Sequence, residues 1–89
     1  MAFTYEKVKE IEFIRMINTG TITKFFAQED INNASKFCIM GLDPVNRIAY
    51  TLRHGRTSEY RSRGSKYIEE FFRKNNIIRW ETQLKNPDV

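Results

Sequence analysis

The stretch from residue 43 to residue 55 constrains the fold of this chain more than any other. Asp43 can cap a helix, Pro44 suits the first helical position because its missing N–H costs no hydrogen bond there, and Gly55 can end the helix. The apolar residues between them recur at the spacing of one buried helical face: Val45, Ile48, Ala49 and Leu52. We therefore predict a helix over residues 44–54.

A β-hairpin is the alternative for the same stretch. Strands over residues 36–42 and 47–53 would flank a turn at Asp43 and Pro44, because Asp and Pro are also favoured at the first two positions of a type I turn. We favour the helix and keep the hairpin as the alternative.

The first third of the chain also predicts a helix. Residues 4–18 are rich in Glu, Lys, Arg and Met, begin with a Thr that can act as a cap, and end before Gly20. The competing interpretation is a hairpin with strands over residues 11–17 and 21–27, since both contain several β-branched residues.

Two more helices and one strand complete the prediction. Asp30 can cap a helix that ends at Gly41. Ser65 opens another helix, whose apolar face repeats at i, i+3 and i+4 with Ile68, Phe71 and Phe72. Residues 78–84 alternate between apolar and polar side chains, which is the pattern of a half-buried strand.

This order of elements predicts a mainly α fold, with a short C-terminal β-strand. Two helices separated by a turn at residues 41–43 resemble the helix-turn-helix arrangement, and the preceding helix with residues 56–64 in a wing-like position resembles a winged-helix domain. The resemblance implies a second helix that enters the DNA major groove. An α+β arrangement, an antiparallel sheet with one or two helices, is the alternative.

Composition sets the frame for this fold. Eighty-nine residues suit one domain over residues 1–89, and 40% hydrophobic residues can fill its core. Cys38 is the only cysteine, so an intramolecular disulfide is excluded and an intracellular, cytoplasmic location is expected. Neither a membrane-spanning run nor a targeting segment is apparent, so we expect no membrane partner.

The positive charge of the chain is concentrated in residues 47–66. This stretch holds six basic residues against Glu59 alone, interleaved with tyrosines, whereas the remainder of the chain is close to neutral. Such a surface can neutralise phosphates, so we predict a small nucleic-acid-binding regulatory or accessory protein that binds DNA rather than RNA. The predicted binding residues are Asn46, Arg47, Tyr50, Arg53, His54, Arg56, Tyr60, Arg61, Arg63 and Lys66.

Within this predicted site, residues differ in role. Asn46 and Arg47 on the predicted recognition helix would contact base edges, because asparagine pairs with adenine and arginine with guanine in the major groove. The other cations would contact phosphates, which orient the protein without reading sequence.

Catalytic and metal sites are not predicted. His54 is the only histidine and lacks Cys, Asp or Glu partners at ligand spacing, Cys38 lies among apolar residues, and the adjacent Glu69 and Glu70 point about 100° apart on a helix. We therefore expect no enzyme and no cofactor. The alternative function is a protein-binding module, such as an inhibitor or adaptor, that docks on an acidic partner surface, and a homodimer is also compatible with the sequence.

Overall fold

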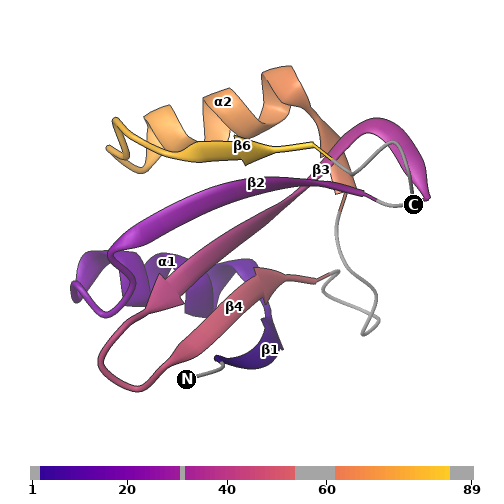
Figure 1. Cartoon of the computed structure of the whole chain (residues 1–89). Coiled ribbons are helices and arrows are strands. Elements are labelled where there is room, and N and C mark those ends of the chain that lie inside the picture. The colour runs from indigo at the N-terminus through magenta and orange to yellow at the C-terminus, as the bar shows by residue number, and fades with distance from the viewer. Residues whose placement is uncertain (1–2, 31, 54–61, 85–89) are drawn as a thin grey trace.

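A computed structural model describes residues 3–30, 32–53 and 62–84 of the chain. These residues form six strands and two helices (Figure 1). In chain order the elements are β1 (Thr4–Val8), α1 (Glu10–Asn18), β2 (Lys24–Asp30), β3 (Asn33–Asp43), β4 (Ile48–Leu52), β5 (Ser62–Gly64), α2 (Ser65–Lys74) and β6 (Glu81–Gln83).

The strands form one mixed sheet in the order β1-β4-β3-β2-β6. The pairs β1–β4 and β2–β6 are parallel, while the long strand β3 runs antiparallel to its neighbours. Strands β4 and β5 take successive places along β3, because Met40 pairs with Thr51 and Cys38 pairs with Ser62. The chain therefore leaves the sheet after β4 and returns to β3 at β5.

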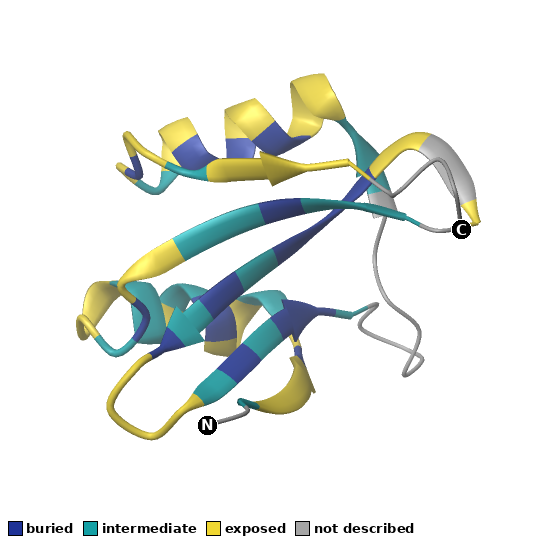
Figure 2. Cartoon of the chain, in the orientation of Figure 1, coloured by how far each residue is buried: buried dark blue, intermediate teal, exposed yellow. Residues whose placement is uncertain are grey.

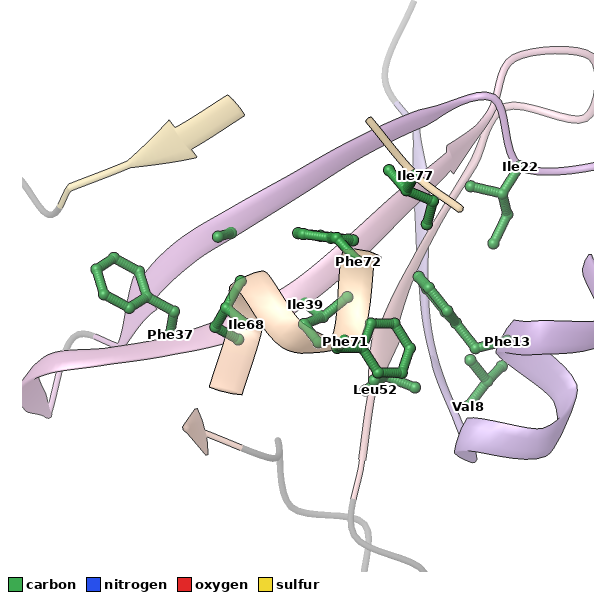
Figure 3. Packing of buried hydrophobic residues seen from close by; sticks show 11 residues of the cluster. Val8, Phe13, Ile22, Phe37, Ile39, Leu52, Ile68, Phe71, Phe72 and Ile77 are labelled. Carbon is green, nitrogen blue, oxygen red and sulfur yellow. The ribbon is translucent and has the colours of Figure 1, made fainter. Parts of the chain in front are cut away.

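Both helices pack on the same face of the sheet. Strand residues such as Val8, Ile39 and Leu52 point to this face, and the helices contribute Phe13 from α1 and Phe72 from α2 to the same core (Figure 3). Each helix is buried on the side toward the sheet and exposed on the other (Figure 2). Within the described part of the chain, the opposite face of the sheet carries no helix.

Aromatic side chains join the two helices to the sheet. The ring centroids of Phe13 and Phe71, one from each helix, lie 6.2 Å apart, and Phe25 of β2 contacts both Phe13 and Phe72. The ring centroid of Trp80, just before β6, lies 4.7 Å from the ring centroid of Phe72. The core is therefore continuous from α1 to β6.

The predicted helix over residues 44–54 is wrong, and this stretch forms the turn and second strand of the β3–β4 hairpin. Asp43 accepts hydrogen bonds from the backbone N–H groups of Val45 and Asn46, at 3.0 and 3.1 Å. These bonds close a turn instead of capping a helix. A helix cannot continue from this turn, because Arg47 adopts a left-handed conformation with φ of 57°. Val45, expected in the core, is 86% exposed.

The mainly α fold class is also wrong, because strands outnumber helices and a sheet organises the core. Residues 4–8 of the first predicted helix form β1, which pairs with a distant strand, and the helix begins only at Glu10. The helix predicted from Asp30 to Gly41 is wrong too, since Asp30 ends β2 and most of the remainder is β3.

The C-terminal prediction is confirmed in part. Helix α2 begins at Ser65 and buries Ile68, Phe71 and Phe72 as expected. The predicted strand over residues 78–84 is shorter, because only Glu81–Gln83 pair with β2. Ile78 precedes this strand and is 96% exposed.

Candidate functional site: the uncovered sheet face

The face of the sheet opposite the helices presents a rectangle of side chains, which we call the uncovered sheet face. The strand registers place Tyr5, Ala49, Leu42 and Lys24 in one row across β1, β4, β3 and β2. A second row, two residues away on each strand, contains Lys7, Thr51, Met40 and Phe26. Since side chains alternate between faces, both rows point away from the helices.

Opposite corners of this rectangle carry the same kind of side chain. Tyr5 on β1 and Phe26 on β2 occupy one diagonal, and Lys7 and Lys24 occupy the other. Each aromatic ring therefore has a lysine two residues away on its own strand, about 7 Å along the chain. Between the corners lie Ala49 and Thr51 of β4 and Leu42 and Met40 of β3.

A shallow hollow of about 210 Å³ lies on this face. Its wall residue Tyr5 is 70% exposed, while Ala49 in its floor is only 1% exposed. The small side chain of Ala49 thus leaves a depression between larger neighbours. The lining residues are Phe3, Tyr5, Phe26, Met40, Leu42, Ala49 and Gln83.

Charge is divided between the two faces of the sheet. By strand alternation, the charged strand residues on the uncovered sheet face are Lys7, Lys24, Lys36 and Glu81. Those on the helix face are Glu6, Glu29, Asp43 and Arg63. Asp30 belongs to neither set because it follows the register shift in β2. The strands therefore give the uncovered sheet face a positive balance and the helix face a negative one.

The structure separates the binding residues that were predicted from the sequence. Asn46 and Arg47 lie in the β3–β4 turn, and Arg53 lies at the other end of β4. Tyr50 of β4 points to the helix face and packs against the core. Burial raises the pKa of the Tyr50 hydroxyl, and the negative charge of Glu6 raises it further.

The remaining predicted residues do not rebuild this cluster. The Arg63 guanidinium lies 5.7 Å from the ring centroid of Tyr67 on the helix side of the sheet, and Lys66 is exposed on the first turn of α2. The rest lie outside the described residues: His54, Arg56, Tyr60 and Arg61.

Sequence reasoning missed every residue of the rectangle. Tyr5 and Lys7 fell in the predicted helix over residues 4–18, and Phe26 was not among the predicted binding residues. The period-two alternation of β2, in which Lys24, Phe26 and Gln28 share one face, was the available signal.

A larger hollow of about 410 Å³ lies between α2 and β6, on the helix side of the sheet. Its rim carries both Lys66 and Glu69, and Trp80 forms part of its wall. Mixed charge gives this hollow no preference for an anion, so the uncovered sheet face is the stronger candidate.

Other classes of site find no support among residues 3–30, 32–53 and 62–84. No group of three or more His, Cys, Asp or Glu side chains is placed there to hold a metal ion. Within the same residues, neither α1 nor α2 has the length and apolar character that a membrane crossing requires.

Comparison with known proteins gives no match: no protein-family model matches the chain, and neither a curated protein nor a solved structure matches it.

Proposed function

We propose that this protein binds nucleic acid through the uncovered sheet face. The observation that carries the proposal is the placement of three lysines and one glutamate on the same face as an aromatic-walled hollow. Lysine side chains attract phosphates, and their binding releases counterions from the polyanion. Planar rings beside them offer contacts to sugars or bases.

This binding surface differs from the one that the sequence predicted. Residues 44–53 form a turn and a strand, so they do not provide the recognition helix that the sequence predicted. Lys24 and Lys36 are exposed on neighbouring strands of the uncovered sheet face, and they flank the region that contains Met40 and Phe26. DNA and RNA share the phosphate and base chemistry on which this proposal rests.

Charge reversal on two surfaces tests the proposal. The variant Lys24→Glu/Lys36→Glu reverses two charges on the uncovered sheet face, and Lys66→Glu/Lys74→Glu makes the same change on exposed positions of α2. Fluorescence anisotropy with labelled oligothymidylate and oligouridylate, across a salt series, measures binding. We expect the first variant to weaken binding strongly and to reduce the salt slope by about 1.4, at about 0.7 per lost phosphate contact.

The α2 variant is the matched control and should bind almost as the parent protein does, since its net charge change is the same. Equal loss in both variants would mean that net charge alone drives binding, and no detectable binding of either oligonucleotide by the parent protein would exclude the proposed function.

A second candidate function is docking on an acidic protein. It is favoured by Ile78, which is 96% exposed and lines two adjoining hollows of about 590 and 360 Å³. Arg79 lines one of them and Arg73 lines the other. Arginine beside an exposed apolar side chain is a common anchor of protein interfaces. Binding of a partner that is lost in Ile78→Asp and kept in Lys24→Glu/Lys36→Glu would support this function.

A further inference from the structure

We infer that the ligand of the uncovered sheet face is a single strand that crosses the sheet from β1 to β2, with one unpaired base over Tyr5 and another over Phe26. This inference rests on the proposed function and specifies its substrate. It is carried by the diagonal placement of the two rings and by the shape of the surface between them.

The two rings line the same side of the sheet. Tyr5 is 70% exposed, Phe26 is half-buried, and both line the same hollow. Duplex DNA buries the faces of its bases in the stack and presents only their edges, in grooves that admit a helix or a two-stranded ribbon. The face of a five-strand-wide sheet is broader than either groove of undeformed duplex DNA. Paired bases keep their faces in the stack, so unpaired bases are the ones that can stack on these rings.

The separation of Tyr5 and Phe26 sets the direction of the nucleic-acid strand. Tyr5 and Phe26 are separated by three strand spacings and two residues along the strands, which gives about 16 Å between their Cα atoms. Consecutive bases of a stacked strand lie about 3.4 Å apart. Neighbouring stacked bases therefore cannot occupy both rings, and the strand must run across β4 and β3 with intervening nucleotides over Leu42 and Met40.

The lysines fit this path. Lys7 follows Tyr5 by two residues on β1, and Lys24 precedes Phe26 by two residues on β2. A strand along the aromatic diagonal thus has a cation on each side of it, one near each end. Phosphates that flank the two stacked bases can lie toward these lysines.

A length series with the intact protein tests the inference. Labelled oligothymidylates of about two to ten nucleotides, the site-size range of small single-strand binders, and a hairpin duplex of equal phosphate number are the probes. A dinucleotide has one step and cannot reach both rings, so affinity should rise with length and level off once both are reached. The duplex should bind more weakly than the longest single strand.

Matched aromatic variants locate the contacts. Tyr5→Leu and Phe26→Leu remove a ring and keep an apolar side chain, and each should weaken binding of the longest oligothymidylate about five-fold or more. Tyr67→Leu makes the same change on the helix side of the molecule and should leave binding unchanged. If Phe26→Leu does not fold by circular dichroism, Tyr5→Leu together with the length series decides, because Tyr5 is largely exposed.

Two outcomes separate this inference from the proposed function. Duplex binding as tight as single-strand binding, or full binding by Tyr5→Leu while Lys24→Glu/Lys36→Glu is weakened, would overturn the single-strand inference and leave nucleic-acid binding in place. Absence of binding to every probe by the parent protein would exclude both.

Discussion

Gly41 shows how a single residue fixes the approach of α1 to the sheet. A Cβ atom at this position would lie 2.5 Å from Cγ2 of Ile22 and 3.1 Å from Cζ of Phe13. The methyl group of a β-branched side chain has little freedom to move away, because its χ1 angle is stiff. The absence of a side chain at residue 41 therefore lets Phe13 and Ile22 pack directly on β3.

We expect Gly41→Ala to destabilise the protein by about 1 to 3 kcal/mol, because it overpacks a filled core. Urea unfolding followed by circular dichroism measures the change. Gly64→Ala is the matched control, since no atom lies within 4 Å of a Cβ built there, and its effect should stay within about 0.5 kcal/mol. Equal stability of the two variants would contradict the described packing.

Asp43 makes the β3–β4 turn sensitive to pH. The side chain of Asn46 donates to its carboxylate at 2.8 Å, and this bond, followed by the Asn46 backbone N–H, lowers the pKa of Asp43 below its ordinary value of 3.8, although burial opposes the shift. A carboxyl group whose folded pKa is lowered stabilises the fold above its unfolded pKa. That stabilisation is lost as the pH falls below 3.8 toward the folded pKa.

We therefore expect Asp43→Asn to be less stable than the parent protein at neutral pH, with a difference that shrinks on acidification. Urea unfolding midpoints at about pH 7 and about pH 2.5 give the comparison, and other carboxyl groups cancel because both proteins contain them. A difference that is the same at both pH values would show that the Asp43 carboxylate does not carry the effect.

At the level of elements, local sequence patterns predicted an element correctly only where its buried residues repeat within its own sequence. Helix α2 was predicted correctly because its buried stripe of Ile68, Phe71 and Phe72 repeats at helical spacing. Its exposed ion pair between Glu69 and Arg73, at 3.6 Å, adds little to stability.

The β3–β4 hairpin shows where local patterns stop. Asp43 and Pro44 suit the start of a helix and the start of a type I turn equally well. The choice between them is made by the backbone hydrogen bonds of β4 to β3 and β1, and β1 is remote in the sequence. The same dependence on remote partners explains why β1 was assigned to a helix.

The candidate site could not be predicted for the same physical reason. Tyr5 and Phe26 are far apart in the chain and share a surface only because β1, β4, β3 and β2 are neighbours in this order. The excess of basic residues over residues 47–66 was visible in the sequence, but the fold places Arg47 and Arg53 at opposite ends of β4. A charge cluster in sequence is therefore not a charge cluster in space.

On the scale of the whole molecule, the two faces of one sheet differ in composition and burial. One face holds the core, with both helices packed on it, and the other combines apolar side chains with lysines. Chemical-shift mapping by NMR tests most directly which face binds the ligand, because the signal of a backbone amide reports whether a ligand lies near it. The titration uses ¹⁵N-labelled protein and the longest oligothymidylate.

We expect the shifts to gather at Tyr5, Lys24, Phe26, Met40 and Leu42, while the exposed amides of α1 and α2 stay unchanged. Shifts confined to the helices or to the β3–β4 turn, or no shifts at all, would contradict it.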